Sequence, residues 1–271
     1  MKVDLHTHTN LSDGKLSPAE LLQRAKGNGI EILSITDHDT VAGYVKIKQP
    51  SLTLIPGIEF STRWNKSGVH IVGLNIDIQS DAICEAVSFQ ATARHKRAED
   101  IAARLERKGI RGAFAGAQRI AGNGNIGRPH FAEYLVQTGV CSSTDDAFRK
   151  YLGSGKSGDI NKFWAAMPQI IDWTRAAGGI AVLAHPLTYK MTRMKLSCLL
   201  DDFIADGGQA IEVVSGRQLP HETQMIAGLC NQKKLMASCG SDFHQLDSTR
   251  ADLGQFPSLP DDCNPVWEKF Q

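Results

Sequence analysis

The first third of the chain alternates short apolar runs with segments of helical spacing. Residues 2–5 and 31–35 are compact apolar runs of the kind that form buried strands. Between them, the sequence Ser-Pro-Ala-Glu at 17–20 combines an N-cap residue, a proline at the first helical position and a glutamate three residues after the cap. This capping box predicts a helix over 18–26 that ends at the glycines that follow. Further strands are predicted at 52–55, 58–62 and 70–76, with a turn at 65–68.

The middle of the chain has a different pattern. Residues 81–108 are rich in charge and have helical spacing. Two later runs, at 131–136 and 145–152, have the pattern of short helices, and glycine and polar residues fill the segments between them. We therefore predict a helical insert at 81–165.

Strand and helix alternate again after the insert. Strands are predicted at 180–184, 210–214 and 235–238, and helices at 193–206 and 220–232. Repeated strand–helix units on both sides of the insert predict an α/β fold, either an α/β barrel or a doubly wound sheet. The domain would be formed by residues 1–80 and 166–271.

Histidines and carboxylates occur at or just past the predicted strands. They are His6, His8, Asp37, His38, Glu59, His70, His185, Asp242 and His244. The C-terminal ends of parallel strands face one rim of a β/α array, so these side chains are expected to converge there. Imidazoles combined with carboxylates are ligands for Zn, Mn or Fe, whereas a Ca site is built from oxygens alone. The sequence therefore predicts a transition-metal site at this rim.

Two of these ligand pairs have the same spacing. His6 and His8 are two residues apart where the chain leaves a strand, so both imidazoles point to one side and can reach one ion. Asp13 follows in the loop and can add a carboxylate, and Asp242 and His244 repeat the spacing near the other end of the chain. Each pair alone is a weak signal; their common position at strand ends carries the prediction.

The composition narrows the kinds of partner. The chain has 271 residues, 42% of them hydrophobic and 22% charged, which suits one large domain or a core domain with an insert. Its formal net charge is +1, so no global field attracts it to nucleic acid or to a membrane. Binding of a polyanion must therefore depend on a local group of basic residues. This favours a small anionic ligand or the end of a nucleic-acid strand over a DNA duplex. No sequence feature indicates an oligomeric state.

Cysteine usage and the first residues indicate a compartment. The six cysteines are scattered without a C-x-x-C pair, and the first ten residues lack the apolar core of a signal peptide. No apolar run has the length needed to span a bilayer. We therefore expect a cytoplasmic protein with reduced cysteines and no membrane partner.

Seven stretches combine the candidate residues in order along nearly the whole chain. They are Asp4-Leu5-His6-Thr7-His8, Ser12-Asp13-Gly14, Ile35-Thr36-Asp37-His38-Asp39, Pro56-Gly57-Ile58-Glu59, His70-Ile71-Val72-Gly73, Ala184-His185-Pro186 and Gly240-Ser241-Asp242-Phe243-His244. Together they resemble the PHP (polymerase and histidinol phosphatase) family. The resemblance implies a distorted seven-stranded (β/α)7 barrel with a helical insert and two or three divalent metal ions.

Three stretches of the insert point to one subgroup. They are Gly116-Ala117-Gln118-Arg119, Gly127-Arg128-Pro129-His130-Phe131-Ala132, and Tyr151-Leu152 with Gly155-Lys156. These resemble the nucleoside 3′,5′-bisphosphate phosphatases and 5′–3′ exoribonucleases of the ribonuclease AM type. The resemblance implies an enzyme that removes the 3′-phosphate of nucleoside 3′,5′-bisphosphates and trims RNA, including ribosomal RNA precursors, from the 5′ end. The substrate would be a nucleotide or a short RNA 5′ end, and the insert would cover the active site.

The resemblance also assigns the metal ligands by position. One ion would be held by His6, His8, Glu59 and Asp242, a second by Asp13, His38 and His244, and a third by Glu59, His70 and His185, with Glu59 bridging. Mn is the expected metal, with Fe and Zn as alternatives, because imidazole with carboxylate suits all three. Such ions lower the pKa of bound water, so a metal-bound hydroxide would be the nucleophile and no catalytic serine or cysteine is required.

A basic group must still hold the second phosphate of the substrate. Arg128 and His130 are the first candidates, because a guanidinium binds phosphate through a planar fork, and Arg119 and Lys156 follow. The basic run at 94–97, which includes His95, is interpreted as a solvated helix face, with contact to RNA as the alternative.

Other residues near the motifs are given supporting roles. Asp4 and Asp37 either orient a ligand imidazole or cap a turn, and Asp39 is predicted to be a helix N-cap. The tryptophans at 64, 164 and 173 are expected to pack in the core. Two segments depart from the subgroup's usual pattern: 40–52 is short for a barrel helix, and 157–161 replaces an aromatic and proline-containing sequence.

Two other functions share parts of this pattern. A histidinol-phosphate phosphatase has the same barrel and metals, but the insert with Arg128 and His130 argues against it. A non-catalytic metal-binding regulatory module is disfavoured because no predicted ligand is missing. Turnover on a panel of phosphoesters distinguishes the three.

Overall fold

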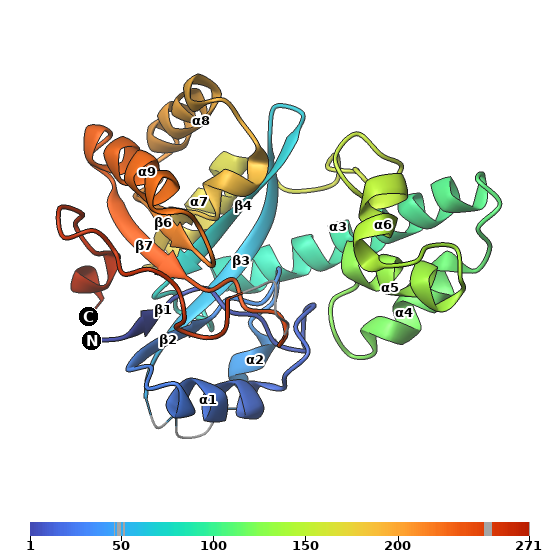
Figure 1. The fold of residues 1–271 in the computed structure, drawn as a ribbon, viewed down its shortest axis with the longest axis horizontal. Coiled ribbons are helices and arrows are strands. Elements are labelled where there is room, and N and C mark those ends of the chain that lie inside the picture. The colour runs from blue at the N-terminus through green and yellow to red at the C-terminus, as the bar shows by residue number, and fades with distance from the viewer. Residues whose placement is uncertain (46, 48–49, 51, 247–250, 271) are drawn as a thin grey trace.

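A computed structural model describes residues 1–45, 47, 50, 52–246 and 251–270. Within them, seven strands form one sheet whose spatial order is also the sequence order (Figure 1). The strands are β1 (Val3–Asp4), β2 (Ile32–Ile35), β3 (Thr53–Trp64), β4 (Ser67–Leu74), β5 (Ile180–Leu183), β6 (Ala210–Ser215) and β7 (Met236–Gly240). Strand β4 is antiparallel to both of its neighbours, and the other neighbouring pairs are parallel. All strands of this sheet except β4 therefore end at the same rim.

The first and last strands come together and nearly close the sheet into a barrel. The Leu5 N–H donates to the Cys239 carbonyl at 3.0 Å, and Thr7 and Phe243 form a parallel bridge just beyond the strands. The barrel predicted from the family resemblance is therefore confirmed, and the doubly wound sheet is excluded.

Helices cover the outside of the barrel and also form a separate group beside it (Figure 1). This second set, from α3 to η1, is called the helical group below. The α-helices are α1 (Pro18–Gly27), α2 (Ala42–Val45), α3 (Asp81–Glu106), α4 (Ala113–Ala121), α5 (Arg128–Gln137), α6 (Thr144–Ala147), α7 (Met167–Ala176), α8 (Arg193–Ala205) and α9 (Pro220–Gln232). Three short elements are the π-helical η1 (Phe148–Leu152) and the 3₁₀-helical η2 (Pro186–Tyr189) and η3 (Val266–Lys269). The capping box that predicted α1 is present, with the Ser17 side chain accepting from the Glu20 N–H and the Glu20 carboxylate accepting from the Ser17 N–H.

Strand β3 is longer than the sequence predicts. Strands were expected at 52–55 and 58–62 because a Pro-Gly pair normally marks a break. One continuous strand of 12 residues passes through Pro56 and Gly57 instead. The pairing changes sides there, since β3 pairs with β2 as far as Pro56 and with β4 from Gly57 onward. The second half of β3 therefore extends with β4 beyond the end of β2.

The helices from α3 to η1 bury an apolar cluster of their own. Its larger members are Ile101, Leu105, Ile110, Ile126, Phe131, Leu135, Leu152 and Ile160. One helix in this group, α4, lies in a segment where glycine-rich sequence predicts a loop. Gly116 lets α4 approach α5 closely, because a Cβ at this position would lie 2.0 Å from the Tyr134 ring.

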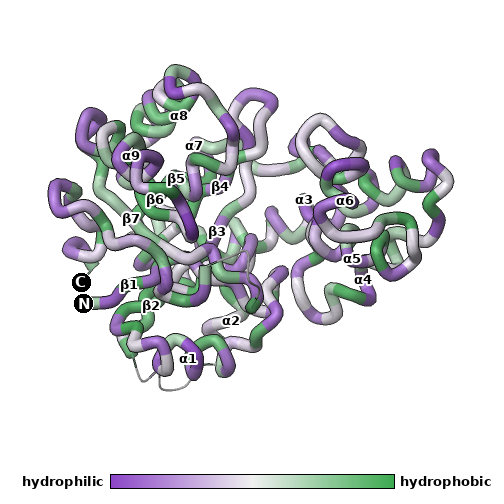
Figure 2. The backbone as a smooth tube through the Cα atoms, in the orientation of Figure 1, coloured by the Kyte–Doolittle hydropathy of each residue, from purple (hydrophilic) through white to green (hydrophobic). Residues whose placement is uncertain are grey.

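Hydrophobic residues are concentrated in the strands of the barrel, as Figure 2 shows for β5, β6 and β7. In the short segment 40–52, the structure has only the four-residue helix α2, and Lys46, Lys48, Gln49 and Ser51 lie outside the described residues. None of the helices in the described part of the chain is both long enough and apolar enough to cross a membrane.

Candidate metal centre and substrate pocket

The structure brings all nine predicted metal ligands together at the rim where the strands end. They are His6, His8, Asp13, His38, Glu59, His70, His185, Asp242 and His244. Their ligand atoms form four overlapping groups, and within each group the atoms lie within 4.8 Å of one another. The sheet produces this convergence, because β1, β2, β5 and β7 end here and β3 and β4 run past the same level.

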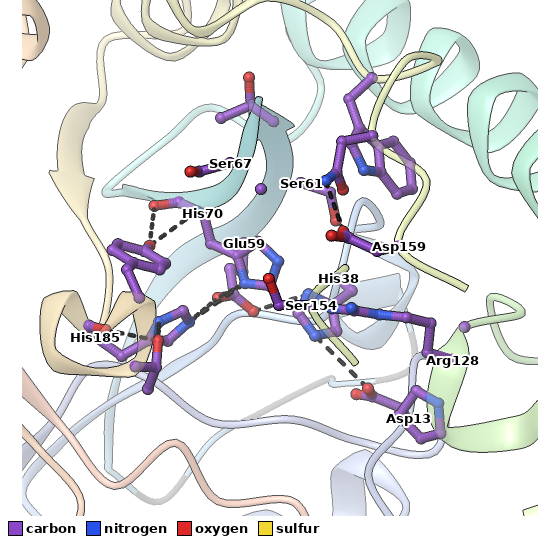
Figure 3. Close-up of a pocket in the computed structure, with 18 of the residues that line it drawn as sticks. Asp13, His38, Glu59, Ser61, Ser67, His70, Arg128, Ser154, Asp159 and His185 are labelled. Atoms are coloured by element: carbon purple, nitrogen blue, oxygen red, sulfur yellow. Dashed lines mark hydrogen bonds and ion pairs between the residues drawn. The ribbon is translucent and has the colours of Figure 1, made fainter. Parts of the chain in front are cut away.

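Glu59 is the centre of the cluster (Figure 3). Its Oε1 lies 2.7 Å from the His70 Nδ1 and 2.9 Å from the His185 Nε2. Its Oε2 lies 2.8 Å from the His38 Nδ1. The carboxylate is completely buried in β3, at a position paired with His38 across a parallel bridge. Glu59 therefore lies close to five of the six histidines in the cluster, all but His244.

Two aspartates, Asp13 and Asp242, contact the histidines on the other sides of the cluster. The Asp13 carboxylate lies 3.3 Å from the His244 Nε2 and 3.6 Å from the His38 Nε2. The Asp242 Oδ1 lies 3.3 Å from the His8 Nε2 and is close to His6 as well.

The grouping in space differs in detail from the one that the family resemblance implies. His8 joins the group of Asp13, His38 and His244, and it also belongs to a group with His6 and Asp242. The remaining groups are His6 with Glu59 and His185, and His38 with Glu59 and His70.

The backbone takes unusual conformations at the ligands. His185 has φ of 26° and Asp242 has φ of 51°, in the left-handed region that residues other than glycine seldom adopt. At Asp242 the N–H donates to the His6 carbonyl at 2.9 Å, which joins the two ends of the chain at the site. Gly240 permits this approach, because a Cβ there would lie 2.3 Å from the Cβ of His6.

Two buried aspartates hold the loops that carry the ligands. Asp4 accepts from the N–H groups of Ser241 and Gly254, at 2.9 and 2.8 Å. Asp37 accepts from the Thr9 N–H at 2.7 Å and from the hydroxyl of Ser12. Of the two roles predicted for these aspartates, the hydrogen bonds match the fixing of turns, and neither carboxylate bonds a ligand imidazole in the described structure.

Asp39 does not cap a helix, contrary to the prediction. Its carboxylate is completely buried and accepts from the Ser61 N–H at 2.8 Å, from the Gln90 amide at 2.7 Å and from the Arg94 Nε at 2.7 Å. The first turn of α2 is instead bonded by the hydroxyl of Thr40. Asp39 therefore joins the barrel to α3.

Sequence reasoning missed Glu212, which lies in β6 and is 2% exposed. One carboxylate oxygen contacts the His6 Nδ1 at 2.9 Å, and the other accepts from the His185 N–H at 2.6 Å. The available signal was a glutamate inside the otherwise apolar run 210–214, because carboxylates are seldom buried without a partner.

The electrostatics keep the central carboxylate ionised and two of the imidazoles neutral. Burial alone raises the pKa of Glu59, but the neighbouring His38, His70 and His6 outweigh burial and hold that pKa well below its usual value. Burial and the adjacent His244 lower the pKa of His8 to about 3. Burial likewise lowers the pKa of His70 to about 4. At neutral pH, His8 and His70 therefore have the uncharged form that binds a metal ion.

The cluster has the chemistry of a metal site. Among the described residues, six of its buried polar atoms make no hydrogen bond, since the short contacts between them lack hydrogen-bond geometry. They are the His6 Nε2, both ring nitrogens of His8, the Asp13 Oδ1, the His38 Nδ1 and the Glu59 Oε2. Buried polar atoms are normally paired, so a converging set of unpaired nitrogen and carboxylate donors fits divalent cations.

A cavity of about 460 Å³ opens from this cluster, and another part of its wall is basic. Arg94 and Arg97 from α3 and Arg128 from α5 contribute guanidinium groups to the wall, and Trp164 contributes its ring. The centres of the Arg94 and Arg97 guanidinium groups lie 5.4 and 5.0 Å from the Trp164 ring centroid. The polar residues Asp159 and Asn161, from the altered segment 157–161, also line the cavity.

The arginines of the basic wall lie close enough to repel one another. Burial lowers the pKa of Arg97 well below its ordinary value, and repulsion by Arg128 and Arg94 lowers it further. A guanidinium keeps its proton in proteins, so this unfavourable energy is relieved when an anion enters. The wall is therefore suited to a phosphate group.

Of the four predicted substrate residues, the structure places Arg128 in the cavity wall and the other three outside the lining. His130 is buried, and its Nδ1 accepts from the Gly127 N–H at 3.0 Å at the start of α5. Arg119 and Lys156 are exposed elsewhere on the helical group.

The basic run at 94–97 is not a solvated face throughout, as the sequence was interpreted. Arg94 and Arg97 are each 6% exposed and face the cavity, and His95 and Lys96 between them face solvent. Spacing of three residues on a helix places the two arginines on one side. Trp164 is buried as predicted, but it borders the cavity.

Comparison with known proteins places this architecture in one family. The PHP domain matches residues 4–158, and the chain belongs to the PHP domain family. The 5′-3′ exoribonuclease of Haemophilus influenzae is 42% identical, over 99% of both chains. The 3′,5′-nucleoside bisphosphate phosphatase of Chromobacterium violaceum is 38% identical, over 99% of this chain and 96% of the relative. An amidohydrolase from Chromobacterium violaceum, solved with bound sulfate, superposes with a TM-score of 0.92 at 37% identity, covering 100% of this chain and 96% of that one.

Proposed function

We propose that this chain is a metal-dependent phosphoesterase that hydrolyses the 3′-phosphate ester of nucleotides that carry a 5′-phosphate. The observation that carries the proposal is a single cavity in which seven of the nine clustered histidines and carboxylates form one part of the wall and three arginines form another. Such a cavity can hold two phosphate groups of one molecule, one for reaction and one for recognition. The names of the two relatives in the comparison describe this chemistry.

Bisphosphate hydrolysis and 5′-end trimming are one reaction on two substrates. In a nucleoside 3′,5′-bisphosphate, and at the 5′ end of RNA, the 3′-oxygen of the first nucleotide is bonded to phosphorus. Water adds its hydroxyl to phosphorus, the bond to the 3′-oxygen breaks, and that oxygen takes a proton. The product is a 5′-mononucleotide in both cases, released with inorganic phosphate or with the shortened RNA. Trimming of ribosomal RNA precursors would be an instance of the second.

The clustered residues would hold two or three divalent ions, with Mn as the first choice and Fe or Zn as alternatives. When bound, such ions lower the pKa of water and neutralise charge on the phosphoryl oxygens. Glu59 would bridge ions, because both of its oxygens face imidazole nitrogens. The protein's own part is to present neutral imidazoles and ionised carboxylates in a fixed geometry. No serine or cysteine is assigned as a nucleophile.

The arginines would bind the 5′-phosphate. Arg97 and Arg128 are the principal candidates, because Arg94 is already paired with Asp39. A guanidinium offers a planar pair of donors that matches two phosphate oxygens. In this proposal residues 81–165 are an insert whose α3 and α5 carry the recognition side of the active site. A cytoplasmic location completes the proposal, and the six free cysteines support it.

The first test is phosphate release from adenosine 3′,5′-bisphosphate by protein freed of metal and reloaded with Mn. Adenosine 3′-monophosphate is the matched control, since it has the same scissile bond and no 5′-phosphate. Short RNAs with a 5′-phosphate or a 5′-hydroxyl extend the comparison. We expect strong preference for the 5′-phosphorylated member of each pair and release of 5′-mononucleotides from RNA.

Other outcomes select the alternatives. Equal turnover of both adenosine nucleotides would show that the arginines do not recognise the 5′-phosphate. Cleavage of histidinol phosphate in place of nucleotides would identify the chain as a small-molecule phosphatase of the histidinol-phosphate type. No turnover of any phosphoester by metal-loaded protein would favour a non-catalytic metal-binding module.

A further inference from the structure

We propose that Glu212 is a positioning residue that sets the metal affinity of the cluster by fixing the ring of His6 and the backbone of His185. The inference rests on the proposed metal-dependent function, and it concerns a residue outside the predicted ligand set. Glu212 reaches both histidines at once, with one carboxylate oxygen for each.

The contact with His6 determines which ring nitrogen carries the hydrogen. An ionised carboxylate only accepts hydrogen bonds, so the His6 Nδ1, 2.9 Å from Glu212, must be the donor. Nε2 is then the ring atom available to a metal ion, and it faces Glu59 and Asp242, at 3.4 and 3.6 Å. This is the tautomer that a metal ligand needs.

The contact with His185 stabilises a rare backbone conformation. His185 has φ of 26° and ψ of 60°, and Glu212 accepts its N–H at 2.6 Å. The ring of His185 is fixed separately: the Thr188 hydroxyl donates to the His185 carbonyl and is therefore the acceptor for the Nδ1 at 2.9 Å. The Nε2 of His185 is thereby the ring atom available to a metal ion, and it lies 2.9 Å from Glu59.

The two histidines belong to one ligand group. His6, Glu59 and His185 form a set whose ligand atoms lie within 4.8 Å of one another. Glu212 therefore contacts two members of the same ligand group without being a member of it. The strand is irregular at this point, since the pairing of β6 with β7 shifts between Glu212 and Val214. Bulges of this kind change the direction of side chains beside functional sites.

Replacement by glutamine separates the positioning role from simple packing. Glu212→Gln preserves the size of the side chain, but an amide has one acceptor and one donor group. If the acceptor stays on the His185 N–H, the donor faces the His6 Nδ1 and forces the hydrogen onto Nε2. If the amide turns over, the His185 N–H meets a donor. Either arrangement disrupts one ligand of the same ion.

The experiment measures metal binding directly. Metal-free wild-type protein and Glu212→Gln are titrated with Mn²⁺ in a calorimeter, and bound metal is counted after dialysis. We expect the affinity for one ion to fall by about 10- to 100-fold, with the affinity for the others near that of the wild type. In the Zn²⁺-loaded proteins, the nitrogen chemical shifts of His6 should show an Nε2-bound ring in the wild type and a changed ring in the variant.

Asp146→Asn is the matched control, because it also converts a buried carboxylate to an amide, in α6 and remote from the cluster. Its metal affinities should equal those of the wild type. Wild-type affinity for every ion in Glu212→Gln would overturn the proposal. If that variant does not fold, Glu212→Asp takes its place: its shorter side chain cannot span both histidines, and undiminished affinity there would overturn the proposal equally. None of these measurements depends on the substrate, so failure of the proposed reaction would be seen separately.

Discussion

The barrel and the helical group bring opposite charges to the same cavity, and they do so by different structural means. The barrel supplies buried imidazoles and carboxylates from strand ends, where the register of the sheet fixes the position of each residue. The helical group supplies arginines, and it is joined to the barrel by apolar packing at the start of α3 and by polar contacts near the ligand loops. The proposal thus assigns the chemistry to the barrel and the recognition of the substrate end to the helical group.

The contacts between the two regions reach the backbone of the ligand loops. The Asn125 amide donates to the His38 carbonyl at 2.9 Å, and the Asn125 N–H donates to the Leu11 carbonyl at 3.0 Å. Arg94 reaches Asp39, the neighbour of His38. A shift of the helical group would therefore also move the loops that carry His38 and Asp13.

The largest expected effect comes from the barrel side of the comparison. His38→Ala should lower kcat/KM by about 10³-fold or more, because it removes a group that supports transition-state charge stabilisation. The loss should be the same for a bisphosphate and for a simple aryl phosphate, since both depend on the cluster. Circular dichroism should show an intact fold. Near-normal turnover in a variant of verified metal content would contradict the assignment of His38.

The next effect concerns the junction of the two regions. Arg94→Met should reduce the free energy of unfolding by about 3 kcal/mol, because it leaves the buried Asp39 carboxylate without its charged partner. The estimate lies at the low end of the range for buried pairs because Asp39 keeps its bonds to Ser61 and Gln90. Denaturant titration measures the change. Arg107→Met, at the exposed end of α3, is the control and should shift stability by less than about 0.5 kcal/mol.

A smaller effect tests the recognition side alone. Arg128→Ala should raise KM for a nucleoside 3′,5′-bisphosphate by roughly 10- to 100-fold, as expected for loss of hydrogen bonds to a charged group. KM for an aryl phosphate should stay unchanged, because that substrate has no second phosphate. Arg119→Ala, outside the cavity lining, is the matched control. Equal increases for both substrates would show that Arg128 does not read the second phosphate.

The smallest effect is expected at the surface of the junction. Lys15 and Glu133 form an exposed ion pair of 2.8 Å between the loop after Asp13 and α5. A double-mutant cycle with Lys15→Ala and Glu133→Ala should give a coupling energy of about 0.5 kcal/mol or less, falling further in high salt. A coupling as large as that of Arg94 with Asp39 would mean that surface charges, too, fix the helical group.

The sequence predicts the barrel side of the site better than the helical side, and the reason is physical. A histidine at the end of an apolar strand can face only the rim of a β/α array, so linear position implies spatial position for residues such as His6 and His185. A basic helix offers no such constraint. Arg94 and Arg97 have the pattern of a solvated face, and only the packing of α3 against the barrel shows that they are buried.

Other residues were missed for related reasons. The role of Glu212 depends on which strands are neighbours, since His6 lies 206 residues away in the chain. Helix α4 depends on a glycine that permits close packing, a feature that local propensity counts against a helix. Trp164 borders the cavity beside two arginines from another element, a contact that its own sequence neighbours do not indicate.

The joining of β1 to β7 has a consequence for how the protein is made. Chains leave the ribosome from the N-terminus, at a rate of about 5–20 residues per second, so His6 and His8 emerge well before Asp242 and His244. Until β7 is synthesised, the imidazoles beside β1 lack the strand whose backbone closes the barrel next to them. The proposed metal centre is therefore completed only at the end of synthesis, and a chain stalled before β7 would expose these histidines to any ion without the geometry that selects among ions.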